Sequence, residues 1–162
     1  AKKRGFGILA LQWWLGGDRY LEPRTMYRLI DERLKGTKGH MLHGFSRGSA
    51  NVPGLARIDR ETKKDLFSLF VLNSGAWPEE NPPGYVRDSS GEAFRGQKFV
   101  AYFGGKDEEW KDAAVKNGRT MRAFLEKRGG VFVKYFEIAE GRHGSFHQSA
   151  DMMNETLDLW LK

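Results

Sequence analysis

Residues 44–48 read GFSRG and fit the pattern Gly-x-Ser-x-Gly, in which one serine stands between two glycines. An apolar run ends directly before this motif and a segment able to form a helix follows it, which predicts that Ser46 lies on a sharp turn from strand to helix. Such a turn strains the serine backbone and projects its hydroxyl above the sheet, while the helix directs N–H groups at the position of an oxyanion. Ser46 is therefore a candidate nucleophile; the alternative is a glycine-rich turn with an idle serine.

A serine nucleophile needs a base to take its proton and an acid to orient that base. Asp107 follows the apolar run at 98–103 and is the candidate acid, although an aspartate in such a loop also caps helices. His143 lies in a glycine-rich loop after the run at 131–138 and is the candidate base. His147, at the start of the last predicted helix, is the alternative base, or else a cap or a supporting residue. We favour His143 because its glycine neighbours let the loop fold back over the serine.

Five short apolar runs have the length of β-strands, and several are apolar at nearly every position, as strands buried on both faces are. They span residues 7–13, 39–43, 68–73, 98–103 and 131–138. Helical spacing appears between or after them, at 23–34, 49–57, 112–128 and from 150 to the end. Strands that alternate with helices indicate a parallel sheet. We therefore expect one domain over residues 1–162, a three-layer α/β/α sandwich with about five mostly parallel strands.

One connection breaks this alternation. Residues 74–97 are rich in proline and glycine and predict a long ordered loop near the site, not a helix. Trp77 lies in this loop and is a candidate to line the pocket for the acyl or alcohol part of a substrate. An aromatic residue in a loop is as often simply packed against the core, so both interpretations stay open.

The composition excludes several kinds of protein. The 162 residues contain no cysteine, which excludes disulfides, thiolate zinc sites and a cysteine nucleophile, and which fits a reducing compartment. The formal charge of +6 comes from lysines and arginines interspersed with acids, so a solvated basic surface is favoured over a nucleic-acid patch. No apolar run approaches the roughly 18 residues of a membrane helix, and no secretory signal is visible. We therefore expect a soluble, cytoplasmic protein that binds neither nucleic acid nor membrane.

The order of the three candidates along the chain is a further indication. Ser46, Asp107 and His143 each come directly after a different predicted strand, and this order is that of α/β-hydrolases. The stretches HGFSRGSA, NSGAW, GGKDEEW and EGRHGSFH resemble small serine esterases of that superfamily, near dienelactone-hydrolase-like and polyhydroxybutyrate-depolymerase-like enzymes. The resemblance runs from about residue 5 to the end. It implies that these three residues form a catalytic triad and that the amide of Arg47 serves the oxyanion hole.

The resemblance also implies parts that we do not find in the sequence. The family has about three strands before the one that matches residues 7–13, and its second oxyanion donor lies after the third strand. We therefore expect a truncated α/β-hydrolase fold in which the amide of Gly16 or Gly17 replaces this donor; the alternative is an ordinary Gly-Gly turn. The uncovered sheet edge predicts a homo-oligomer, with a dimer through the end that holds Trp13 and Trp14 favoured.

These features predict a serine hydrolase that cleaves small carboxylic esters through an acyl-enzyme intermediate, with a Ser-His-Asp triad and with neither a metal nor a cofactor. Two alternatives stay open. The chain is a non-catalytic protein of the same fold that acts as a binding module, or it is a fragment that needs the missing strands for activity.

Overall fold

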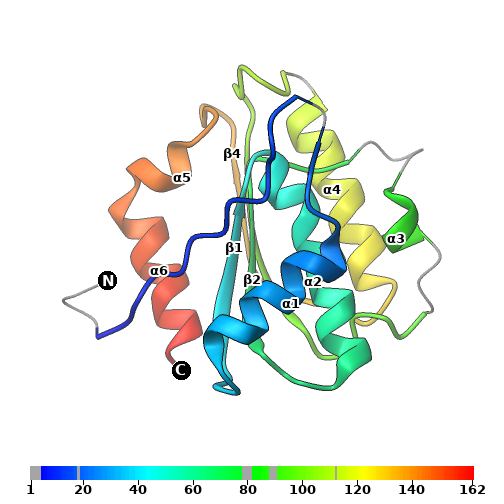
Figure 1. Cartoon of the computed structure of the whole chain (residues 1–162). Coiled ribbons are helices and arrows are strands. Elements are labelled where there is room, and N and C mark those ends of the chain that lie inside the picture. The colour runs from blue at the N-terminus through cyan, green and yellow to red at the C-terminus, as the bar shows by residue number, and fades with distance from the viewer. Residues whose placement is uncertain (1–4, 18, 78–81, 88–90, 112) are drawn as a thin grey trace.

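The computed structural model describes residues 5–17, 19–77, 82–87, 91–111 and 113–162. Its centre is a sheet of four parallel strands in the spatial order β1-β2-β3-β4 (Figure 1). The strands are β1 His40–Phe45, β2 Phe67–Asn73, β3 Lys98–Gly104 and β4 Val131–Ile138. The helices are α1 Pro23–Leu34, α2 Arg47–Thr62, α3 Gly84–Arg87, α4 Ala113–Glu126, α5 Ser145–Gln148 and α6 Ala150–Trp160. Because every strand runs in the same direction, all four carboxyl ends lie at one edge of the sheet.

Helices cover both faces of this sheet and create two hydrophobic cores. The helices α1, α2 and α4 lie on one face, and α5 and α6 lie on the other (Figure 1). Along β2, Phe70 and Leu72 belong to the core under α2, whereas Leu69 and Val71 belong to the core under α6. This alternation is that of a strand buried on both faces. The predicted three-layer α/β/α sandwich is confirmed.

The prediction of a fifth strand at residues 7–13 is wrong. The described residues of this segment join no ladder of the sheet. Leu11 and Trp13 pack against the core with their side chains, while Ile8 stays 80% exposed. The segment is apolar because parts of it cover the core, and apolarity over seven residues does not distinguish such a cover from a strand.

Within the connection at 74–97, the described residues are mostly outside regular helices and strands, but they include the one-turn helix α3, which the prediction of a loop without a helix excluded. Residues 78–81 and 88–90 of this connection lie outside the described residues. Two amides of α3 donate to the carbonyl of Pro83, at 2.8 and 3.0 Å. Proline is favoured at the start of a helix, and a single turn is too short to show helical periodicity in the sequence.

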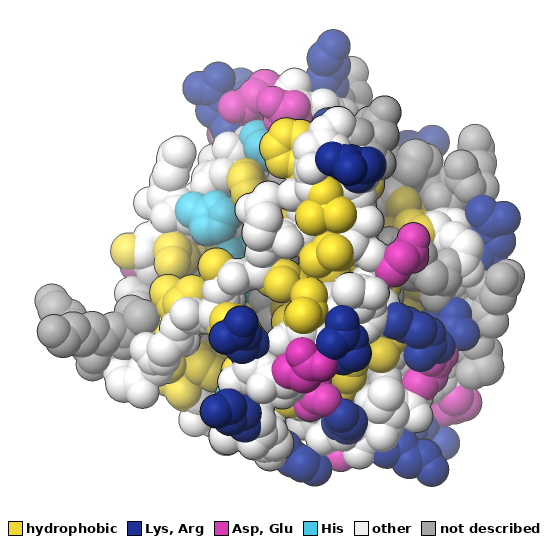
Figure 2. All heavy atoms as spheres, in the orientation of Figure 1, with side chains coloured by type: hydrophobic (Ala, Val, Ile, Leu, Met, Phe, Trp, Pro, Cys, Tyr) yellow, Lys and Arg dark blue, Asp and Glu magenta, His cyan; other side chains and the backbone are white. Residues whose placement is uncertain are grey.

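Several large hydrophobic side chains remain at the surface. Figure 2 shows a band of hydrophobic side chains across one face, with histidines beside its upper part and Lys and Arg around its lower part. The exposed hydrophobic residues include Ile8, Leu9, Trp14, Leu15 and Phe45. Among the described residues, no helix combines the length and the apolarity needed to cross a membrane. The homodimer through Trp13 and Trp14 stays a prediction.

At the Gly-x-Ser-x-Gly motif, β1 and α2 cross so closely that Gly44 has no room for a side chain. A Cβ atom there would lie 2.5 Å from the Gly48 carbonyl oxygen and 2.5 Å from Val52 Cγ2. At Gly48 itself, a Cβ atom would meet only Trp13 Nε1, at 3.9 Å, which is an ordinary contact. The close crossing therefore requires glycine at the first position of the motif but not at the last.

We expect Gly44→Ala to lower the free energy of unfolding by about 2 kcal/mol or more, because the new methyl group must displace a backbone carbonyl and a packed valine. For a chain of this size, that loss corresponds to a melting temperature about 4–8 °C lower. Gly48→Ala is the matched control and should be neutral or slightly stabilising, since alanine favours a helix more than glycine does. Thermal denaturation followed by circular dichroism measures both. Equal melting temperatures for the two variants would contradict the close crossing.

Candidate active site

The loops that follow β1, β3 and β4 meet at the carboxyl edge of the sheet. The strand register pairs Phe45 with Asn73 and Asn73 with Tyr102, so the ends of β1, β2 and β3 form one row. Ser46 follows this row directly, and its amide donates to the Asn73 carbonyl at 2.8 Å. Parallel sheets place their sites at this edge because successive loops emerge there side by side.

Ser46 occupies a strained turn between β1 and α2. Its φ is 54° and its ψ is −125°, a backbone conformation that residues other than glycine rarely adopt. Gly75, just after β2, approaches this turn so closely that a Cβ atom would lie 1.9 Å from the Ser46 carbonyl oxygen. The Ser49 hydroxyl donates to the Gly75 carbonyl at 2.7 Å and ties the two loops together. The loop after β2 thus maintains the strain at Ser46. The strained turn is predicted from the sequence, whereas the roles of Gly75 and Ser49 are not.

The Asp107 carboxylate is fully buried and has three hydrogen-bond donors around it. Its two oxygens lie 3.0 and 2.9 Å from Nδ1 of His143. The Oδ1 atom also accepts from the amides of Glu109 and Trp110, at 3.0 and 3.1 Å. Asp107 therefore caps the turn that follows it and orients an imidazole at the same time, so the two interpretations of this residue are not exclusive.

Backbone contacts tie the loop that carries His143 to the loop that carries Asp107. The His143 amide donates to the Glu108 carboxylate at 3.1 Å, and the Lys106 amide donates to the Gly141 carbonyl at 2.9 Å. Hydrogen bonds from the backbone amides of Glu108 itself and of His143 lower the pKa of the Glu108 carboxyl. The imidazole is thereby held with Nδ1 toward Asp107, which leaves Nε2 as the nitrogen that faces away from the acid.

Ser46 and His143 are both described, and no hydrogen bond joins the Ser46 hydroxyl to the His143 imidazole. The two residues are linked through Phe45, whose ring centroid lies 4.8 Å from that of His143. The imidazole thus packs against the residue directly before the candidate nucleophile. Hydrogen bonds between catalytic groups are often long in enzymes without substrate and shorten when substrate binds.

His147 has different partners from His143. Its Nε2 lies 3.2 Å from the side-chain nitrogen Nδ2 of Asn73, and Nε2 of His43 lies 3.1 Å from the same nitrogen. Loss of hydration lowers the pKa of His147, and the charge of nearby His143 lowers it further. Among the described residues, His143 has a carboxylate as hydrogen-bond partner, that of Asp107, and His147 has none. Nor is His147 the cap of the last helix, because Ser149 takes that place.

The residues predicted to bind an oxyanion lie around the start of α2. Arg47 is the first residue of α2, and its guanidinium donates to the Tyr20 hydroxyl at 3.2 Å. Gly16 and Gly17 form a turn at φ values of 93° and 57°, in which the Trp14 indole donates to the Gly17 carbonyl at 2.8 Å. The contact between Arg47 and Tyr20 brings the segment that contains this turn to α2. That either glycine amide reaches the position of an oxyanion stays a prediction.

Trp77 lies in the hydrophobic core. It is 4% exposed, and its ring packs edge-on against Phe124 of α4, with 5.9 Å between the centroids. Of the two interpretations of Trp77, a residue that lines a substrate pocket or one that packs against the core, the structure shows the second.

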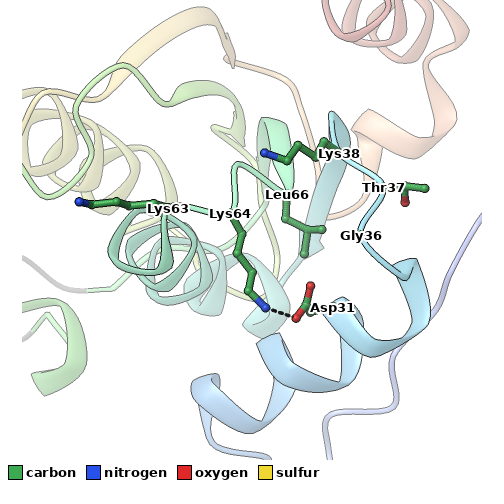
Figure 3. A pocket seen from close by; sticks show the side chains of 7 residues that line it. All are labelled: Asp31, Gly36, Thr37, Lys38, Lys63, Lys64 and Leu66. Carbon is green, nitrogen blue, oxygen red and sulfur yellow. Dashed lines mark hydrogen bonds and ion pairs between the residues drawn. The ribbon is translucent and has the colours of Figure 1, made fainter.

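A hollow of about 350 Å³ lies at the opposite edge of the sheet, at the amino ends of β1 and β2 (Figure 3). Asp31 and Lys64 form an ion pair beside it. The remaining lining residues are Gly36, Thr37, Lys38, Lys63 and Leu66. None of the candidate catalytic residues lines this hollow, so its volume does not make it the active site.

The described side chains also bear on metal binding. No group of three or more His, Asp or Glu side chains in this part of the chain is arranged to hold a metal ion. The His43 and His147 nitrogens that converge on Asn73 face its side-chain nitrogen Nδ2, which is a hydrogen-bond donor.

Several solved structures share this fold, among them two esterases and a protein of unknown function. The structure of a fungal esterase from Rhizomucor miehei superposes with a TM-score of 0.59 at 9% identity, over 86% of this chain and 57% of its own. The protein Atu2452, of unknown function, from Agrobacterium tumefaciens gives 0.57 at 16% identity, over 85% and 59%. A thermostable esterase gives 0.56 at 16% identity, over 86% and 37%.

The chain thus spans between about a third and three fifths of the length of these proteins. At such identities the likeness establishes the fold, and a fold alone does not determine a reaction. No protein-family model matches the sequence, and no curated protein sequence matches it.

Proposed function

We propose that this chain is the catalytic part of a serine esterase, with Ser46 as nucleophile, His143 as base and Asp107 as acid. The observation that carries the proposal is a hydrogen bond between the buried Asp107 and the partly buried His143, at the same sheet edge as a serine held at positive φ. A serine with no chemical role has no need of that strain, and an aspartate that only caps a turn has no need of a histidine. The two esterases that share the fold support the same reaction class.

In the proposed reaction, Nε2 of His143 takes the proton of the Ser46 hydroxyl while the oxygen attacks the carbonyl carbon of an ester. The imidazolium then gives this proton to the leaving alcohol, and an acyl-enzyme remains. Water, deprotonated by the same nitrogen, attacks the acyl-enzyme, and the imidazolium returns this proton to the Ser46 oxygen as the ester bond breaks and the acid leaves. Asp107 accepts from Nδ1 and stabilises the imidazolium without taking the proton itself.

The oxyanion formed in each step needs backbone donors near Ser46. We assign the amide of Arg47, at the start of α2, to this role, because helix amino termini present unpaired N–H groups and a partial positive charge. We assign the second donor to Gly16 or Gly17. Loss of one such donor costs a hundredfold or more in rate, on the order of 3 kcal/mol, so this second assignment decides how fast the enzyme is. The substrates we propose are small carboxylic esters, and the reaction uses no cofactor.

A second candidate function is a binding module that keeps the fold without turnover. The observation that favours it is the missing hydrogen bond between the Ser46 hydroxyl and the His143 imidazole. An idle serine and an activated serine differ in reactivity toward a fluorophosphonate, which acylating enzymes accept even when their turnover is slow.

Covalent labelling separates the two functions. We expect a fluorophosphonate probe to modify the intact protein once, and peptide mapping by mass spectrometry should locate the modification at Ser46. Ser46→Ala should lose the label. Ser68→Ala is the matched control, because Ser68 is an exposed serine that bonds the Gly39 carbonyl in front of β1, and this variant should keep the label. A protein that stays unlabelled, or a label elsewhere, would favour the binding module.

A further inference from the structure

We propose that Asn73 is a positioning residue of this site. Its carboxamide donates one hydrogen to His43 and one to His147 and holds both rings as neutral Nδ1–H tautomers, so that His143 is the imidazole of this cluster that takes up a proton. The catalytic consequence rests on the proposed esterase function, whereas the tautomers do not.

The assignment begins with the hydrogen bonds of a fully buried amide. Asn73, the last residue of β2, is 0% exposed. Its Nδ2 lies 3.1 Å from Nε2 of His43 and 3.2 Å from Nε2 of His147, and its Oδ1 accepts from the Ser74 hydroxyl at 3.0 Å. An amide nitrogen donates two hydrogens and accepts none, so this orientation of the carboxamide makes both Nε2 atoms acceptors. An imidazole that accepts at Nε2 is neutral and carries its hydrogen at Nδ1.

The same residue is connected to the candidate catalytic groups in two ways. Its backbone carbonyl holds the Ser46 amide at 2.8 Å. Through its side chain it holds His147, whose ring lies 4.7 Å from that of Phe45, and Phe45 in turn lies 4.8 Å from His143. A charge on His147 would therefore stand near the imidazolium that forms on His143 during acylation, and like charges at that range oppose each other.

The groups around His43 and His147 do not stabilise positive charges on the two rings. The ring of His43 lies 5.7 Å from that of Phe146 and 5.1 Å from that of His147. This packing removes water and, together with the charge of His147, lowers the pKa of His43 to about 4, although part of the residue stays exposed. The charged group that lowers the pKa of His147 is His143, in the loop before α5. The carboxylate nearest to His143 is that of Asp107, which is already hydrogen-bonded to His143 and to two backbone amides.

Imidazole nitrogen chemical shifts of the ¹⁵N-labelled full chain at pH 7 test the tautomers without any turnover. We expect the signals of His43 and His147 to be those of neutral rings protonated at Nδ1. The variants His43→Gln and His147→Gln assign the signals by their disappearance. If either ring is protonated at Nε2, or is an imidazolium at this pH, the proposal is overturned, because such a ring cannot accept from the Asn73 amide.

The variant Asn73→Asp tests the catalytic consequence. A carboxylate accepts where the amide donates, so it demands Nε2–H on both rings and favours their charged form. With both rings protonated, their two positive charges exceed the single negative charge of the new carboxylate, and the net positive charge opposes the imidazolium that forms on His143. We expect kcat for a small ester to fall about tenfold at pH 6, the equivalent of one pKa unit, with KM little changed. This loss of kcat should become smaller as the pH rises, because the additional protons on the His43 and His147 rings dissociate.

The control is Asn154→Asp, the same chemical change on an exposed position of α6, which should leave kcat unchanged. A ratio of variant to parent kcat that stays constant between about pH 5 and 8 would remove the electrostatic role of Asn73. If Asn73→Asp does not fold, the tautomers of the unsubstituted protein still decide the assignment. If the tautomers are as expected but the parent protein neither hydrolyses esters nor reacts with the probe, the proposed function fails and the assignment of the tautomers stands.

Discussion

Ser46→Ala is expected to lower kcat for p-nitrophenyl acetate by about 10⁴-fold or more, while the fold remains intact. The acyl-enzyme route needs an oxygen nucleophile at this position, and an alanine side chain has none. What remains is the slow attack of water, assisted only by binding and by the oxyanion donors. Initial rates of ester hydrolysis, normalised to the concentration of folded protein, measure this loss.

The backbone strain at Ser46 provides a control for this prediction. Alanine at φ 54° keeps the strain of the turn, whereas glycine relieves it. Ser46→Gly should therefore be as inactive as Ser46→Ala but more stable, by about 1 kcal/mol in the free energy of unfolding. Loss of activity in both variants, with a higher melting temperature for the glycine variant, separates the chemical role of the hydroxyl from any effect on folding. Retention of more than a tenth of the activity in either variant would exclude Ser46 as the nucleophile.

The elements with local signals were predictable from the sequence. The segment 23–34 is helical as predicted, because Pro23 opens it and Lys35, in the left-handed conformation, ends it before Gly36. The strand at 131–138 has the predicted bounds. The strained serine turn was predictable for the same reason, since five consecutive residues and their flanking elements specify it.

The features that sequence analysis missed depend on partners far away in the chain. Residues 7–13 have the apolarity of a strand, but strand formation needs a backbone partner, and nothing in a local pattern reports whether one is present. Asn73 is merely the last residue of an apolar run in the sequence. Its role depends on His43 and His147, which lie 30 and 74 residues away. The sequence does indicate that Asn73, His43 and His147 lie at or after the ends of predicted strands. This places all three at one edge of the sheet, but it does not predict which side chains are in contact.

The second large effect is expected at Asp107, where the hydrogen bonds specify which atom of an asparagine would face His143. In Asp107→Asn, the amides of Glu109 and Trp110 continue to donate to Oδ1. The new NH₂ group then takes the place of Oδ2, which lies 2.9 Å from Nδ1 of His143. This donor competes with Oδ1, which lies 3.0 Å from the same Nδ1, and it favours an imidazole that accepts at Nδ1 and carries its hydrogen at Nε2. An imidazole in this tautomer has its lone pair at Nδ1 and none at Nε2, so Nε2 cannot accept the Ser46 proton.

We therefore expect Asp107→Asn to lower kcat about 10⁴-fold, with a small change in melting temperature because the cap of the turn is kept. The matched control is Glu108→Gln, the same change one residue further along, on an exposed carboxylate that accepts from the backbone amides of Glu108 itself and of His143 and lies 3.7 Å from the Arg142 guanidinium. This control should lose no more than severalfold, since it leaves the tautomer of His143 alone. Steady-state kinetics measure kcat in both variants, and the imidazole nitrogen shifts of His143 report the tautomer directly. Full activity in Asp107→Asn would mean that the buried carboxylate only caps its turn, and the base would then have to be sought in a histidine with no acid behind it.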